Sequence, residues 1–213
     1  GTQEISSIIA QLGCGVSQVI GTGGRDLKLE IGGLMMKLGL EALIDDPNTK
    51  VITLVSKPPA REIASEILDI AKAAGKPVVV CFIGGDRAEI EKKGLVAAVS
   101  LEDAAHKAVA LLKGEPVKDF TGFAMGEQQA EALADDIAAK MAKGQRYVRG
   151  LYTGGTLCDE AMKLMIDSLG HIYSNIPLRA EDKLADARGG KSLRHCFLDF
   201  GDDEFTVGRP HPM

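Results

Sequence analysis

Two short runs of apolar and β-branched residues constrain the fold of this chain more than any other feature. Residues 51–55 read Val-Ile-Thr-Leu-Val, and residues 78–83 read Val-Val-Val-Cys-Phe-Ile. Strands that are buried on both faces have this composition, and they occur in parallel sheets covered by helices. The amphipathic stretch 61–74 lies between the two runs and predicts the crossover helix that parallel neighbours require. The chain therefore predicts an α/β fold with an open parallel sheet.

Strand and helix patterns continue to alternate on both sides of these runs. Weaker strand patterns cover residues 16–20 and 96–99, and helical periodicity covers 2–13, 32–44, 88–93 and 101–112. Such alternation is typical of a flavodoxin-like sheet with helices on both faces.

A second unit follows a break in the pattern. Periodicity lapses over residues 114–124, where glycine and proline occur together, and this stretch predicts a linker. The domains are therefore predicted as 1–113 and 125–213. The second contains helical patterns at 127–142 and 157–169 and strand patterns at 147–152 and 195–200. Helices 4–13 and 160–170 are similar enough to predict a related α/β unit, although chance likeness of two amphipathic helices explains them equally. The abrupt ends, with no initial methionine, predict a truncated second domain and a fragment of a longer protein.

Composition excludes several classes of protein. Hydrophobic residues make up 45% of the chain, as in a globular protein. The net charge is −5 and the basic residues are dispersed, which argues against nucleic acid as a partner. No apolar run is long enough for a membrane span, and the four cysteines have no close C-x-x-C spacing, so a cytoplasmic protein with reduced thiols is expected.

Glycine-rich turns are the elements that could carry chemistry. A turn of this kind before a helix exposes backbone N–H groups at the positive end of the helix dipole, where phosphate or carboxylate binds. Each turn alone is better explained as a tight connection of an α/β fold, but three in one chain favour an anion site. The predicted anion-binding residues are Gly1, Thr2, Gly23, Gly24, Arg25, Gly154, Gly155 and Thr156. The turns match neither a P-loop nor a complete dinucleotide-binding fingerprint.

The same segments carry a family resemblance. Residues 1–4, 15–18 and 21–26 resemble the second domain of succinyl-CoA synthetase alpha subunits, a likeness that covers about residues 1–112. Residues 151–160 and the closing segment 198–213 look like FdrA proteins, predicted acyl-CoA synthetases, in particular. The resemblance implies a ligase-type acyl-CoA synthetase that binds a small anionic substrate such as phosphate or an acyl phosphate.

One departure from the family bears on the reaction. In the synthetases a histidine-bearing loop follows the strand that corresponds to 78–83, whereas residues 84–88 read Gly-Gly-Asp-Arg-Ala. The phosphohistidine of the family is therefore missing. His106 is expected to be an ordinary helix residue, and His171 and His195 to have structural roles.

The last segment holds the other candidate residues. His211 lies between two prolines, and Arg209 has the planar fork that suits phosphate or carboxylate, so both are predicted to act at the anion site, His211 as a proton donor. Asp202 and Asp203 are candidate ligands for Mg²⁺, with a solvated acidic turn as the alternative.

These residues leave three functions open. The first is an acyl-CoA synthetase-like enzyme, with the anion held between the helix starts at Thr2 and Thr156, nucleotide and Mg²⁺ as further cofactors, and CoA on an N-terminal domain that the chain lacks. The second is carbamoyl transfer from oxalurate to phosphate by an oxamate carbamoyltransferase subunit, which needs no phosphohistidine. The third is a non-catalytic anion-binding subunit. A partner subunit or homo-oligomer would complete the assembly.

Overall fold

The computed structural model describes residues 1–120, 122, 125–189 and 191–209. It divides the chain into two compact units, Gly1–Phe120 and Thr121–Met213. The division falls inside the stretch that the sequence predicts as a linker. Each unit has its own sheet and its own core, and each is described by itself.

The first unit is built on a three-stranded parallel sheet. Its strands are β1 (Ile52–Ser56), β2 (Val78–Phe82) and β3 (Val96–Ala97), in the order β1-β2-β3. Leu54 lies opposite Val80 in the register of β1 and β2, and every residue of β2 is buried. The two apolar runs of the sequence are thus neighbouring strands.

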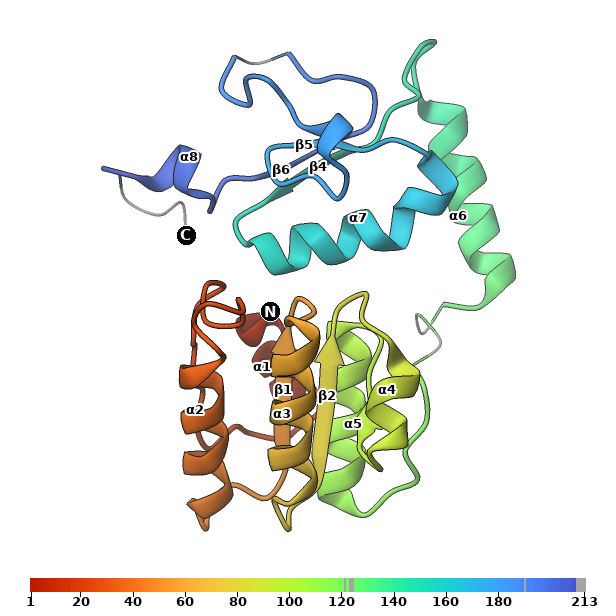
Figure 1. Ribbon diagram of the computed structural model, residues 1–213. Coiled ribbons are helices and arrows are strands. Elements are labelled where there is room, and N and C mark those ends of the chain that lie inside the picture. The colour runs from red at the N-terminus through yellow and green to blue at the C-terminus, as the bar shows by residue number, and fades with distance from the viewer. Residues whose placement is uncertain (121, 123–124, 190, 210–213) are drawn as a thin grey trace. The chain divides into compact units, whose positions relative to one another are not determined.

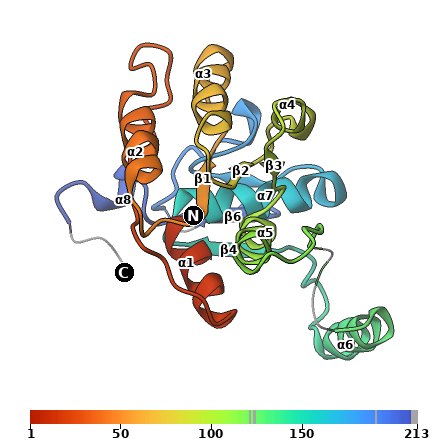
Figure 2. The same cartoon turned by 90° about the horizontal axis from the view of Figure 1, so that it is seen from below.

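Helices cover both faces of this sheet, which confirms the predicted fold class. Helices α1 (Thr2–Gln11) and α5 (Leu101–Lys113) lie on one face, and α2 (Leu34–Asp45), α3 (Arg61–Lys72) and α4 (Arg87–Lys92) lie on the other (Figures 1 and 2). Side chains of β2 alternate between the two layers: Val79 and Cys81 pack with α1 and α5, whereas Val80 and Phe82 pack with α2, α3 and α4. Burial on both sides explains why the strand carries no polar residue.

One predicted strand is wrong. Residues 16–20 form irregular chain, and Val16 and Val19 are about half exposed. Side-chain contacts of Ser17 and Ile20 hold the segment in place of a sheet ladder. The hydroxyl of Ser17 lies 2.8 Å from that of Thr49, and Ile20 packs against Gly39 of α2 so closely that a Cβ at Gly39 would lie 3.2 Å from Ile20 Cγ2. The segment therefore runs beside α2 instead of extending the sheet.

The second unit contains a smaller parallel sheet. Its strands are β4 (Arg149–Tyr152), β5 (Tyr173–Ser174) and β6 (Cys196–Asp199), in the order β4-β6-β5. Helix α7 (Gly155–Leu169) follows β4 and packs on the sheet through a core of Cys158, Met162, Ile172 and Phe197. The remaining elements are α6 (Glu127–Lys140), the 3₁₀ turn η1 (Ala180–Asp182) and the short helix α8 (Asp203–Thr206).

Two class predictions concern membranes and thiols. Among the described residues, no helix is both long enough and apolar enough to span a bilayer. All four cysteines are free, and Cys81 and Cys196 are buried in strands as predicted. Burial raises the pKa of the Cys196 thiol, which suppresses the reactive thiolate.

Candidate functional site

The start of α1 is the first predicted anion site. Gly1 is the N-cap residue, its carbonyl accepts a hydrogen bond from Ile5 N at 3.1 Å, and its lack of a side chain means that no side-chain cap is present. Ile5 and Ile9 are buried and fix the helix against the sheet. Thr2 is exposed in the first turn, where backbone N–H groups and the positive end of the dipole face outward.

The glycine turn at residues 21–24 does not begin a helix, contrary to prediction. The helix α2 starts later, with Gly33 as its N-cap. Its first N–H groups are satisfied by the buried carboxylate of Asp26, which accepts from Met35 N at 2.9 Å and from Met36 N at 2.8 Å. The positive end of α2 therefore already holds an anion that belongs to the chain.

The residues of the turn itself remain accessible. Gly23, Gly24 and Arg25 are exposed, and Gly23 has the positive φ of 79° that favours glycine. A Cβ at Gly23 or Gly24 would meet nothing within 4 Å. The backbone at this turn is open to a ligand, although without the helix dipole that the sequence predicted for it.

The third predicted site, at Gly154, Gly155 and Thr156, does begin a helix. Gly154 is the N-cap of α7. The buried carboxylate of Asp199, at the end of β6, lies beside it: a Cβ at Gly155 would be 3.0 Å from Asp199 Oδ2. Asp199 is held by Gly201 N, which donates to Oδ1 at 2.9 Å, and by a pair of hydrogen bonds between its backbone and the Asn175 amide. The sequence pattern did not reveal this approach of a carboxylate to the helix start.

The acidic turn after β6 provides the N-cap of a short helix. Asp202 is the N-cap of α8 and accepts from Glu204 N at 3.1 Å, while Asp203 is exposed in the first turn. Within the described residues, no three His, Cys, Asp or Glu side chains are grouped as metal ligands. The role of Asp202 and Asp203 as Mg²⁺ ligands stays a prediction.

The two predicted catalytic residues, Arg209 and His211, belong to the last segment of the sequence. Arg209 is exposed, and its backbone N–H donates to the carbonyl of Thr206 at 2.9 Å. His211 lies outside the described residues. Their joint action on an anion stays a prediction.

Hydrogen bonds and ion pairs fix the loop 84–88, which lacks the family histidine. Gly85 N donates to Phe82 O at 2.7 Å, and the Asp86 carboxylate caps α4 by accepting from Ala88 N at 2.8 Å. Arg87, the first residue of α4, binds Glu91 and Asp119. A pocket of about 130 Å³ lies beside this loop and was not predicted; its lining includes Pro58, Pro59, Arg61, Phe82, Gly85 and Asp86.

Three histidines lie in the described part of the chain. His106 is a helix residue of α5, as predicted, and stacks on Phe120 with ring centroids 4.6 Å apart. His171 Nδ1 lies 2.8 Å from Oδ1 of the buried Asp182. His195 Nδ1 accepts from Val148 N at 3.2 Å. Contacts of this kind fit the structural roles that the sequence predicts for His171 and His195.

The candidate elements of the first unit share one edge of its sheet. Figure 1 shows that the start of α1 and the loop before α2 lie at the end toward which β1 and β2 point. The pocket lies there too, since Pro58 follows β1 and Gly85 follows β2. Ligands of open α/β sheets bind outside the carboxyl ends of the strands. The α7 start belongs to the other unit, so the predicted clamp between Thr2 and Thr156 stays a prediction.

Comparison with known proteins supports a class of protein. Residues 1–84 match the family model of the CoA binding domain, and residues 151–212 match that of CoA-ligase. These matches support a succinyl-CoA synthetase-like protein with a CoA-ligase domain. The CoA-binding match falls on this chain itself, whereas the sequence resemblance placed CoA on a preceding domain.

A relative is known from Escherichia coli (strain K12). The chain is 45% identical over 213 residues to the uncharacterized protein YahF, covering 100% of this chain and 40% of YahF. The chain thus spans less than half the length of that relative.

Proposed function

We propose that this chain is the anion-binding part of an acyl-CoA synthetase-like ligase of the FdrA kind, which joins an acyl group to CoA. The observation that carries the proposal is the pair of matches, CoA binding over residues 1–84 and CoA-ligase over residues 151–212. The matches fall on two α/β units, each of which contains a parallel sheet. Fold alone does not define a reaction, so the proposal also depends on the carboxyl-edge elements of the first unit.

The start of α1 is the proposed site for phosphate or acyl phosphate. The starts of α2 and α7 each have a carboxylate of the chain beside them, from Asp26 and Asp199. The first turn of α1 also carries a carboxylate, Glu4, but Glu4 is exposed, whereas Asp26 and Asp199 are buried, and repulsion by an exposed charge is screened by solvent, which favours the α1 start at Thr2. In such a ligase the thiol of CoA gives up its proton and its sulfur bonds to the acyl carbon, while the bond between that carbon and a phosphate oxygen breaks and the oxygen keeps the electron pair. N–H groups at a helix start stabilise the departing phosphate.

Phosphate groups of CoA or a nucleotide also have partners at this edge. The turn at Gly23 and Gly24 offers open backbone, and the guanidinium of the exposed Arg25 provides a planar fork for phosphate. These residues fit a phosphate-bearing substrate. They leave the choice between CoA and nucleotide to experiment.

A second reaction is favoured by one observation. The loop 84–88 has no histidine, and its Asp86 and Arg87 are already engaged in capping and ion pairing. Phosphorolysis of oxalurate needs no phosphohistidine: phosphate oxygen attacks the carbamoyl carbon, and the nitrogen of oxamate leaves and takes up a proton. Carbamoyl phosphate would be the product.

Product analysis separates the functions. The protein is incubated with a carboxylic acid, CoA and nucleotide, or with oxalurate and phosphate, with and without candidate partner subunits. Acyl-CoA from the first mixture supports the ligase, and carbamoyl phosphate from the second supports the alternative. Phosphate binding without either product would overturn both and leave a non-catalytic subunit.

A pair of variants tests the α1 start. Thr2→Glu places a carboxylate at the first helical position, where it is compatible with the helix dipole but repels phosphate. We expect Thr2→Glu to weaken phosphate binding at least tenfold, measured by calorimetry, and the uncharged Thr2→Gln to change it less than threefold. Equal effects of the two variants on phosphate binding would contradict an anion site at this helix start.

A further inference from the structure

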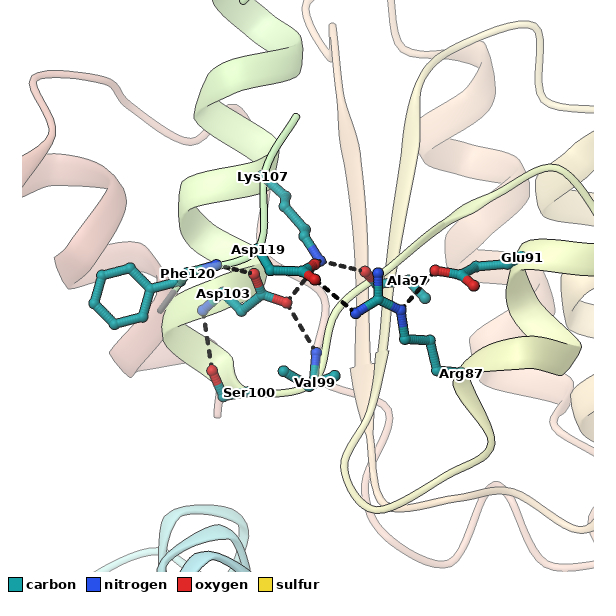
Figure 3. Close-up of polar contacts among 9 residues, drawn as sticks. All are labelled: Arg87, Glu91, Ala97, Val99, Ser100, Asp103, Lys107, Asp119 and Phe120. Carbon is teal, nitrogen blue, oxygen red and sulfur yellow. Dashed lines mark hydrogen bonds and ion pairs between the residues drawn. The ribbon is translucent and has the colours of Figure 1, made fainter. Parts of the chain in front are cut away.

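A buried lysine joins the end of the first unit to its core. Lys107 of α5 is 2% exposed, and its ammonium group donates three hydrogen bonds, to Ala97 O at 2.7 Å, to Asp103 Oδ2 at 2.8 Å and to Asp119 Oδ1 at 2.7 Å (Figure 3). An ammonium group has three N–H donors, so every donor is used. Two of the acceptors belong to the core of the unit, and the third belongs to the connecting segment after α5.

Asp103 is the central acceptor of the network. Its side chain is fully buried, and it accepts from Lys107, from Val99 N at 3.0 Å and from Phe120 N at 2.9 Å. Asp103 N in turn donates to the hydroxyl of Ser100 at 3.1 Å, and this bond caps the start of α5. The inner pair of Asp103 and Lys107 is therefore fixed by the fold of α5 itself.

The contacts of Asp119 form an outer layer with different properties. Its second oxygen accepts from Arg87 Nη1 at 2.9 Å, and the two side chains are 46% and 42% exposed. Phe120, the next residue, stacks on His106. Exposed ion pairs contribute little and are screened by salt, whereas buried pairs are costly to break. The pair of Arg87 and Asp119 is therefore the contact of the network that opens most easily, and the pair of Asp103 and Lys107 is the most persistent.

We propose that Asp119 and Phe120 form a latch that fastens the connection between the two units to the carboxyl edge of the first sheet. Two elements meet at the latch. One is the connecting segment. The other is Arg87, which belongs to the histidine-free loop 84–88 beside the pocket and is the first residue of α4. Closing the latch shortens the connection and holds this loop at the same time.

The length that the latch controls is considerable. α5 ends at its C-cap Gly114, and residues 115–119 are exposed. Release of Asp119 and Phe120 frees residues 115–120, and six residues at about 3.4 Å each correspond to up to about 20 Å of extended chain. Opening and closing of the latch therefore change how much of the chain after α5 is free.

Hydrogen exchange tests the latch. In Asp119→Asn we expect the amide of Phe120 to exchange at least tenfold faster than in the wild type, and the amides of Gly85 and Ala88 at least threefold faster. The core amide of Ala98, bonded to Val80 O at 2.8 Å, should not change, which distinguishes latch opening from global unfolding. Asp136→Asn, which removes an exposed ion pair on α6, is the control and should alter none of these rates. Unchanged exchange at Phe120 would overturn the latch, and unchanged exchange at Gly85 would overturn its coupling to the loop.

Proteolysis gives an independent measurement. Arg87→Gln breaks the outer ion pair without altering the sequence around Lys118, so trypsin should cut after Lys118 at least threefold faster. Arg61→Gln is the matched control, because it removes an exposed arginine that lies 3.5 Å from Glu89. Equal cleavage rates in the two variants would argue against a latch made by Arg87.

Discussion

The carboxylate of Asp199 lies close to Gly155, the first residue of α7, and a Cβ at this glycine would be only 3.0 Å from Asp199 Oδ2. A comparable arrangement occurs in the first unit, where Asp26 caps α2. In both units a carboxylate of the chain is placed beside a helix start that follows a glycine-rich segment. Stabilising the fold and binding an external anion are therefore competing uses of the same helix dipoles.

Substitution of Gly155 tests the first relationship. In Gly155→Ala the new Cβ would lie 3.0 Å from Asp199 Oδ2, so the buried carboxylate must move. We expect a loss of about 1–3 kcal/mol in the free energy of unfolding, as for other overpacked sites. Gly154→Ala is the matched control, since its Cβ meets nothing within 4 Å, and it should cost less than about 0.5 kcal/mol. Urea denaturation of both variants gives the comparison, and equal stabilities would contradict the close approach.

Removal of the Asp26 carboxylate tests the second relationship. Asp26→Ala leaves the amides of Met35 and Met36 without their acceptor, and we expect a loss of about 1–2 kcal/mol in the free energy of unfolding. Asp45→Ala changes an exposed aspartate at the other end of the same helix and should be neutral within about 0.5 kcal/mol. Phosphate should raise the melting temperature of Asp26→Ala more than that of the wild type, because the vacated helix start becomes free for an anion.

The layered sheet could be predicted from the sequence because a strand that is buried on both faces is apolar at nearly every position. The run 78–83 has no polar residue, and it became β2. The strand expected at 16–20 failed because alternation of apolar and polar residues specifies a half-buried surface, and contact with Gly39 of α2 provides one without a ladder. Asp26 and Asp199 could not be assigned as neighbours of helix starts, since Asp199 approaches Gly155 from a strand distant in sequence. Glycine spacing identifies a helix start but does not reveal what lies beside it.

Loss of Lys107 should be severely destabilising. Lys107→Met leaves the fully buried Asp103 carboxylate without its cation, and breaking a buried pair in this way costs about 3–5 kcal/mol. Lys140→Met is the control on α6, where the partner Asp136 is more than half exposed, and it should cost at most about 0.5 kcal/mol. The measurement is guanidinium or urea unfolding followed by circular dichroism. A loss below 1 kcal/mol in Lys107→Met would contradict a stabilising buried ion pair between Lys107 and Asp103.

The latch should also leave a signature in acid. Hydrogen bonds and charge from Arg87 and Lys107 lower the pKa of the Asp119 carboxyl from its ordinary 3.8 to about 2. Because the pKa is lower in the folded protein, the contribution of Asp119 to stability is fully present above pH 4 and is lost as the pH falls toward 2. Wild type should therefore lose more of its unfolding free energy than Asp119→Asn between pH 5 and pH 2, and the two stability curves should converge. Urea unfolding at a series of pH values tests this, with Asp136→Asn as the exposed-carboxylate control. Parallel curves for wild type and Asp119→Asn would mean that Asp119 gains nothing from its two cations, and the outer contacts would then have no energetic basis as a latch.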